Sequence, residues 1–213
     1  DLYARTGKRG GAWMDECRVR RLDYLGSLQL PVAYLTCNFT GPLADDPALL
    51  SHNEVVTLFH EFGHGLHHML TKIDAAAVSG INGVAWDAVE LPSQFMENFC
   101  WQAGSLSFIS GHYETGKPLP EDMLDKLLRA KNHNAAMMMV RQLEFGLFDF
   151  RLHLEFDPDE KSQVQRILDQ VRQDVSVMLP PAEYAFQHGF SHIFGGGYAA
   201  GYYSYKWAEV LSS

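Results

Sequence analysis

The chain has 213 residues, a length that suits one large domain. Hydrophobic residues make up 46 % and charged residues 20 %, which is too apolar for a disordered chain. The 26 acidic and 17 basic residues give a net charge of −9, which would repel nucleic acid and anionic membrane surfaces. No apolar stretch approaches the roughly 18 residues of a membrane-spanning helix. Neither nucleic acid nor a membrane is therefore an expected partner.

The first predicted element is a strand at 31–40, which is rich in β-branched and aromatic residues and ends at a Gly-Pro pair. A helix follows from Ser51 to about Thr71, opened by a capping box of Ser51 and Glu54. Its apolar residues recur every three or four positions and predict one buried face, made of Val55, Leu58, Phe59, Phe62, Leu66, Met69 and Leu70. The glycine-containing segment 74–87 predicts a loop with room for a short strand.

Helices are predicted for most of the remaining chain. One begins near Pro92, with the proline in its first turn, and its apolar side reaches Leu106. Three more are expected from Pro120 to about Lys131, at 134–156 and at 162–178, before a glycine- and tyrosine-rich bend at 190–205 and a last helix. The fold class is therefore mainly α with a small β component, in one domain over residues 1–213. Met137, Met138 and Met139 are expected in its core.

The three cysteines, Cys17, Cys37 and Cys100, form no C-x-x-C pair. They can build neither a disulfide framework nor a cysteine-rich zinc module, which favours a reducing compartment and predicts a cytoplasmic protein. Cys100 is expected in the core. The start at Asp1 shows neither an initiator methionine nor a signal-peptide pattern, and the last helix has no exit signal, so we expect a fragment of a longer protein.

The first helix carries the motif His60-Glu61-Phe62-Gly63-His64, an H-E-x-x-H spacing. Residues four apart lie on one helix face, so both imidazoles can reach one ion, with Glu61 beside them. The alternative is an ordinary amphipathic helix with half-exposed histidines. Against that alternative, a glycine in mid-helix costs about 1 kcal/mol relative to alanine, so Gly63 predicts a close backbone approach by another element.

Glu90 is the predicted third ligand, because it follows the motif past a loop at the start of the next helix. Three protein ligands with one open position make a catalytic zinc site, whereas a structural site would take a fourth ligand. We therefore expect one Zn²⁺ held by His60, His64 and Glu90. Glu97 is expected to accept a hydrogen bond from a zinc-bound imidazole. His67 and His68 do not fit the ligand spacing and are expected to serve in packing or at the surface.

Six segments together resemble the thimet oligopeptidase (M3) family of zinc peptidases, and within it a bacterial-type branch. They are His60–His68, Asp87–Asn98, Lys8–Trp13, the strand that ends in Asn38-Phe39, Arg141–Asp149 and the closing tyrosine-rich segment. The resemblance implies a zincin-like catalytic domain in which His60, His64 and Glu90 bind zinc and Glu61 is the general base. It also implies that family members are about three times longer, with an N-terminal helical region that this chain lacks and that would be its partner.

The negative oxygen that forms when water attacks a peptide carbonyl needs a second partner besides zinc, and that partner should be a hydrogen-bond donor. Tyr198, Tyr205 and His192 are the candidates, and the resemblance implies the same residues. The alternative for this segment is an aromatic core helix behind a flexible turn. Because Gly195, Gly196 and Gly197 allow motion, we expect a lid that closes on the substrate.

The sequence thus predicts a cytoplasmic zinc endopeptidase that acts on short peptides, a substrate preference that comes from the resemblance. A dipeptidyl carboxypeptidase of the same family is one alternative, although no residue indicates a carboxylate-binding group. The other is a zinc-stabilised, non-catalytic interaction domain, against which the intact Glu61 argues. The edge of the strand at 32–39 could pair with an extended peptide.

Overall fold

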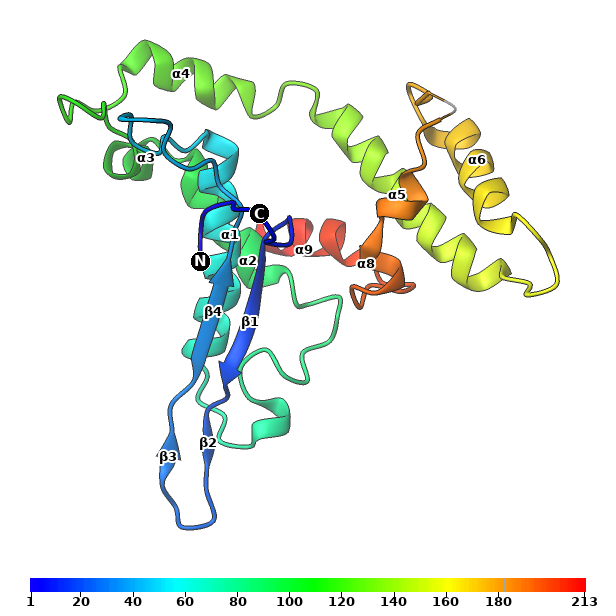
Figure 1. Cartoon of the computed structure of the whole chain (residues 1–213), viewed down its shortest axis with the longest axis horizontal. Coiled ribbons are helices and arrows are strands. Elements are labelled where there is room, and N and C mark those ends of the chain that lie inside the picture. Colours follow the sequence, from blue (N-terminus) through cyan, green and yellow to red (C-terminus); the bar gives the residue numbers. More distant parts are fainter. Residues whose placement is uncertain (182) are drawn as a thin grey trace. The chain divides into compact units, whose positions relative to one another are not determined.

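The computed structural model describes residues 1–181 and 183–213. The chain forms two compact units, one of residues 1–130 with 208–213 and the other of residues 131–207. Helices dominate both, and strands occur in the first, so the predicted mainly α fold class is confirmed (Figure 1). In the part of the chain that is described, no helix combines the length and the apolarity that a membrane crossing requires.

The strands of the first unit form two antiparallel pairs. The strand β1 (Trp13–Arg18) pairs with β4 (Val32–Thr36), with Trp13 opposite Thr36 and an irregularity next to Arg18. The short strands β2 (Arg21–Leu22) and β3 (Leu28–Gln29) continue the same hairpin (Figure 1). The prediction of β4 is confirmed, whereas β1 was missed because its sequence, WMDECR, mixes charged and apolar residues without alternation.

The helix α1 (His52–Met69) packs on β1 and β4 and carries the motif. Its N-terminus has the predicted capping box, in which Ser51 accepts from the Glu54 N–H and the Glu54 carboxylate accepts from the Ser51 N–H. The predicted buried face is wrong in part, because Phe62, Met69 and Leu70 are exposed. The buried positions of α1 are instead Glu61, Gly63, His64, Gly65 and His68.

The second predicted helix is shorter than expected. The helix α2 (Leu91–Glu97) has its proline in the first turn, as predicted, and passes into the 3₁₀ helix η2 (Asn98–Trp101). Extended backbone at Gln102 then separates it from α3 (Ala103–Ile109). The loop at 74–87 contains the 3₁₀ helix η1 (Ala76–Val78) rather than a strand. The helix predicted from Pro120 to about Lys131 is present as α4 (Glu121–Ala130).

The core of the second unit lies between α5 (Ala135–Glu155) and α6 (Gln163–Val175). The short helices α7 (Phe186–Gly189) and α8 (Ser191–Phe194) and the start of α9 (Ser204–Ser212) complete it. The buried cluster consists of Phe145, Phe148, Leu152, Ile167, Leu168, Val171, Phe190, Ile193 and Tyr202. The adjacent methionines Met137, Met138 and Met139 are exposed, so their predicted place in the core is wrong.

Candidate metal centre

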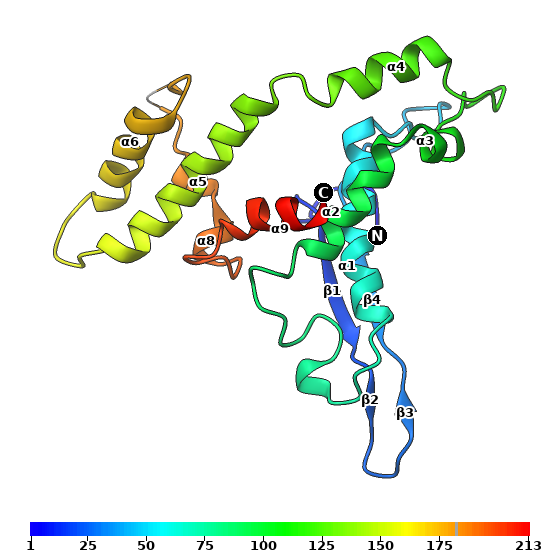
Figure 2. The same ribbon diagram turned by 180° about the vertical axis from the view of Figure 1, so that it is seen from behind.

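Two helices of the first unit approach closely at Gly63, and Figure 2 shows α1 and α2 side by side. A Cβ atom added at Gly63 would lie 2.5 Å from the carbonyl oxygen of Pro92, so no larger side chain fits there. The close backbone approach predicted from this glycine is confirmed. It places Glu90, at the N-cap of α2, beside His60 and His64, which lie one turn apart on α1.

The three predicted ligand side chains converge. Nε2 of His60 lies 3.2 Å from Oε2 of Glu90, and Nε2 of His64 lies 3.3 Å from the same oxygen. One ligand atom from each residue lies within 4.8 Å of the other two. Ligands placed tetrahedrally at about 2.0–2.1 Å from zinc lie about 3.3 Å apart, so these separations fit a zinc ion. Two imidazoles and one carboxylate also leave a fourth position open, as in catalytic zinc sites.

Two neighbouring side chains orient the cluster. Nδ1 of His60 lies 2.7 Å from Oε1 of Glu97, the carboxylate expected to accept from it. The hydroxyl of the fully buried Ser93 lies within donating distance of two oxygens of Glu90, the backbone carbonyl at 2.8 Å and Oε2 at 2.9 Å. Such outer contacts fix the orientation of metal ligands. Ser93 was missed in the sequence, although its position three residues after Glu90 in the first turn of a helix was a usable signal.

The cluster perturbs the ionisation of its own members. Burial disfavours the charged imidazole of His60, but hydrogen bonds to Glu90 and Glu97 outweigh it and raise the pKa of His60 to about 10. Burial also favours the neutral acid of Glu90, yet hydrogen bonds to His60 and His64 hold the pKa of Glu90 far below its usual range. His60 therefore carries a proton at neutral pH, and a metal cation competes with that proton.

Glu61 lies next to the cluster and is only 5 % exposed. Its Oε2 is a buried atom without a hydrogen-bond partner among the described residues, as is Nδ1 of His64. Burial raises the pKa of Glu61, and the charges on His60 and His64 partly oppose that rise. Because a buried acceptor without a donor costs free energy, the position suits a carboxylate whose donor is a molecule that enters the site.

The three candidate hydrogen-bond donors lie together in the second unit. The rings of Tyr198 and Tyr205 stack with centroids 4.9 Å apart, and the His192 ring lies 6.2 Å from each of them. Tyr202 packs against the same group, 5.0 Å from Tyr205 and 5.8 Å from His192. The structure therefore brings these three candidates into one cluster, while the candidate metal ligands form another cluster within the first unit.

Two further expectations concern packing. His68 is fully buried, with Nε2 2.8 Å from the carbonyl oxygen of Arg18, so it joins α1 to β1 as a packing residue. Cys100 is buried as predicted.

The edge of the strand at 32–39 is partly covered by the chain itself, because the Cys37 N–H donates to the Asp1 carbonyl at 2.9 Å. This cover argues against peptide binding at that part of the edge.

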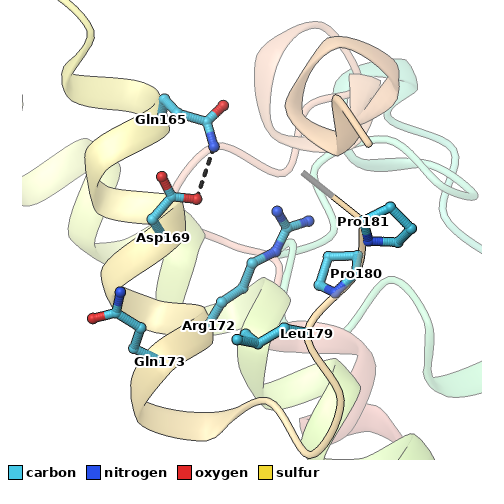
Figure 3. Close-up of a pocket in the computed structure, with 7 residues that line it drawn as sticks. All are labelled: Gln165, Asp169, Arg172, Gln173, Leu179, Pro180 and Pro181. Atoms are coloured by element: carbon cyan, nitrogen blue, oxygen red, sulfur yellow. Dashed lines mark hydrogen bonds between the residues drawn. The ribbon is translucent and has the colours of Figure 1, made fainter. Parts of the chain in front are cut away.

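The second unit contains a cavity of about 200 Å³ (Figure 3). It is lined by Gln165, Asp169, Arg172, Gln173, Leu179, Pro180 and Pro181. Arg172 reaches it from a buried ion pair, in which Nε lies 3.1 Å from Oε1 of Glu144. None of the predicted metal-binding or catalytic residues lines the cavity, so it is not part of the candidate site.

Sequence comparison gives the chain its relatives. Oligopeptidase A of Escherichia coli (strain K12) is 64 % identical over 215 residues, which cover 100 % of this chain and 31 % of that protein. Saccharolysin of Saccharomyces cerevisiae is 38 % identical, with 100 % of this chain and 30 % of that protein covered. Dipeptidyl carboxypeptidase of Escherichia coli is 34 % identical, with 100 % and 31 % covered.

The chain thus spans about a third of the length of the curated relatives it matches. The profile of Peptidase family M3 matches residues 1–213, which is the whole chain. The resemblance read from the motifs is confirmed, and the chain belongs to peptidase family M3.

Proposed function

We propose that residues 1–213 form the catalytic domain of a zinc-dependent endopeptidase that hydrolyses short peptides. One observation carries the proposal: Nε2 of His60, Nε2 of His64 and Oε2 of Glu90 converge beside the buried carboxylate of Glu61. The donor set supports a catalytic ion, and the buried Glu61 supports a proton acceptor next to it. A zinc-stabilised interaction domain has no need for that carboxylate.

Each residue of the site has its own role in the proposed reaction. His60, His64 and Glu90 would hold the zinc ion, which when bound supplies a Lewis acid that makes water more acidic and polarises a carbonyl. Glu61 accepts a proton from the attacking water and delivers it to the leaving amine. Its raised pKa lies closer to neutral pH, which suits both transfers.

Tyr198, Tyr205 and His192 are proposed to donate hydrogen bonds to the oxygen that becomes negative as the peptide carbonyl is attacked. The clustering of their rings supports a shared task. The proposal also gives this domain a partner within the full-length protein, the N-terminal helical region implied by the resemblance. The 31 % coverage of oligopeptidase A agrees with a longer protein. A cytoplasmic location stays a prediction from the cysteine content.

Short peptides are the proposed substrates because the name of the 64 % identical relative is oligopeptidase A. The relative named dipeptidyl carboxypeptidase is 34 % identical over the whole chain, so that activity is the second candidate. Internally quenched peptides with blocked C-termini separate the two. The full-length protein should cleave them, whereas failure on blocked peptides with cleavage of unblocked ones would favour the carboxydipeptidase.

Replacement of Glu61 by glutamine in the full-length protein tests the mechanism. We expect activity to fall by about 10²- to 10⁴-fold, because the proton acceptor is lost, while elemental analysis finds unchanged zinc. Glu114→Gln, at an exposed glutamate, is the matched control and should keep full activity. His64→Ala should lose the zinc itself.

The outcomes separate the candidate functions. Wild-type activity in Glu61→Gln would show that Glu61 is not the general base. A wild-type protein that binds zinc but cleaves no peptide, before or after chelation and reloading, would instead favour the non-catalytic interaction domain.

A further inference from the structure

Asp149, on α5, is a fully buried carboxylate that no step of the proposed reaction uses. Its Oδ1 accepts from the backbone N–H of Ala200 at 2.8 Å, and its Oδ2 accepts from the backbone N–H of Tyr202 at 2.8 Å. Nδ1 of His153, one turn along α5, lies 2.9 Å from Oδ1. These contacts join a core helix to the end of the glycine-rich loop at 195–201.

We propose that Asp149 is a positioning residue that clamps the end of this loop and thereby sets the places of Tyr198 and Tyr205. The inference rests on the proposed function, which gives those tyrosines their role as donors. Asp149 itself touches backbone N–H groups rather than either tyrosine ring. It would therefore act through the loop and would not be a catalytic residue.

The backbone of the loop end explains why a carboxylate is needed. Ala200 has a φ of 52°, a left-handed conformation that alanine rarely adopts. Two N–H groups close together, those of Ala200 and Tyr202, donate to one side chain, and a carboxylate is acceptor-only with two oxygens. A buried carboxylate in turn requires such partners, because burial of an unpaired charge is costly.

A second set of contacts holds the other side of Tyr198. Its N–H donates to the His192 carbonyl at 3.0 Å, and its own carbonyl accepts from the Gly201 N–H at 2.9 Å. Tyr198 is thus fixed between α8 and the clamped turn at Ala200. Because its ring stacks on Tyr205, a shift of the turn would separate the two rings and misplace both hydroxyls. Misplacement of about 1 Å can cost about 10²-fold in rate.

Asp149→Asn in the full-length protein tests the clamp. Asparagine can accept only one of the two N–H bonds and turns a donor toward the other. We expect kcat to fall by about 10- to 100-fold with a smaller change in KM and unchanged zinc content, because the substrate still binds but its transition state is less stabilised. Hydrogen exchange should accelerate at residues 195–203 and not in α6.

Two control variants define the origin of the effect. Asp174→Asn changes an exposed aspartate of the same unit and should leave kcat, KM and exchange unchanged. His153→Ala keeps both N–H bonds to Asp149 and should lower kcat less than Asp149→Asn does. A wild-type kcat in Asp149→Asn would overturn the clamp. So would a fall in kcat accompanied by faster exchange to the same degree in every helix, because that would show general destabilisation and not a local effect on the loop.

A measurement on the wild-type protein covers the case in which Asp149→Asn does not fold. The clamp predicts that the amides of Ala200 and Tyr202 exchange much more slowly than that of Gly197. Equal exchange at these positions would overturn the inference without any variant. This readout also stands if the wild type cleaves no peptide, so failure of the clamp and failure of the proposed function are distinguishable.

Discussion

Gly63 is the residue on which the geometry of the metal centre depends most directly. It lies between the two histidines, and the backbone of α2 occupies the space that a side chain would need. The same contact brings Glu90 within 3.3 Å of His64. The helix propensity lost at one glycine, about 1 kcal/mol, is therefore the cost of close helix packing.

Gly63→Ala should reduce zinc occupancy and lower the melting temperature, because the added Cβ forces α1 and α2 apart and withdraws Glu90 from the histidines. Gly146→Ala is the matched control, since Gly146 also lies within a helix but has open space around its Cβ position. The control should be neutral or stabilising by up to about 1 kcal/mol. Normal zinc content in Gly63→Ala would refute the steric account.

His60 makes zinc binding depend on pH. Its pKa is raised from 6.5 to about 10, so its stabilising contribution to the metal-free fold is complete below pH 6.5 and is lost as the pH rises through about 10. Zinc must displace that proton, so its affinity should fall as the pH falls. Calorimetry at pH 7.5 in buffers of different ionisation enthalpy should detect release of about one proton per zinc.

Glu97→Gln is the control for this titration. It removes one carboxylate that raises the pKa of His60, so it should reduce proton release at the same pH. Binding of zinc without proton release by the unchanged protein would contradict the paired state of His60 and Glu90.

The helix α1 shows how an apolar pattern can mislead about packing. Its periodic residues predicted a face that includes Phe62, Met69 and Leu70, yet these are exposed and the motif face is buried. The small residues Gly63 and Gly65 allow the motif face to be the buried one, because the backbone of α2 lies close to Gly63 and the Leu35 side chain of β4 lies close to Gly65. Close backbone packing here takes priority over the burial of large side chains.

The three glycines predicted to let the loop move differ in how they tolerate a test substitution by alanine. A Cβ at Gly196 would lie 2.8 Å from Cα of His192, and Gly197 has a φ of 91°, so alanine at either position would distort the loop sterically. Gly195 has open space and a φ of −134°, which alanine can adopt. Gly195 is therefore the position at which backbone freedom alone can be changed.

Gly195→Ala should lower kcat by about two- to fivefold if the loop moves as a lid, since alanine restricts the backbone by about 0.5–1 kcal/mol. Gly104→Ala, in α3 with no atom near its Cβ position, is the control and should keep the wild-type rate. Unchanged steady-state kinetics in Gly195→Ala would argue against a hinge at this residue.

Many large apolar side chains are exposed among the described residues, and one row of them lies along α5. The helix α5 buries one face in the core of the second unit, while a second row at helical spacing is exposed: Met139, Leu143, Leu147, Phe150 and Leu154. A helix that is apolar on two sides is typical of an element buried on both. We therefore expect the outer face of α5 to be covered in the full-length protein.

Triple replacement of Leu143, Leu147 and Leu154 by glutamine should benefit the isolated 213-residue chain and harm the full-length protein. In the isolated 213-residue chain it should lower dye binding to apolar surface and reduce aggregation. In the full-length protein it should destabilise by about 1.5–3 kcal/mol for each side chain that becomes buried. The control is a double variant in which the exposed Asp125 and Arg129 are replaced by asparagine and glutamine. An unchanged melting temperature of the full-length triple variant would show that this face is uncovered.

Local rules were enough for much of this protein. The capping box at Ser51, the proline turn at the start of α2, and helices α4, α5 and α6 follow from signals within a few residues, as does the H-E-x-x-H pairing of His60 and His64. The long motif match also sufficed to identify the family. Such features depend on i to i+4 relations that sequence spacing encodes directly.

Other features depend on contacts between residues far apart in the chain, which spacing does not encode. The burial of the motif face, the exposure of Met137 to Met139 and the break of the second helix at Gln102 reflect which surfaces find partners. Asp149 likewise stood out only once its donors, the N–H groups of Ala200 and Tyr202, were in place more than 50 residues further along the chain. A carboxylate in a sequence carries no sign of its burial, because burial is a property of the elements that pack around it.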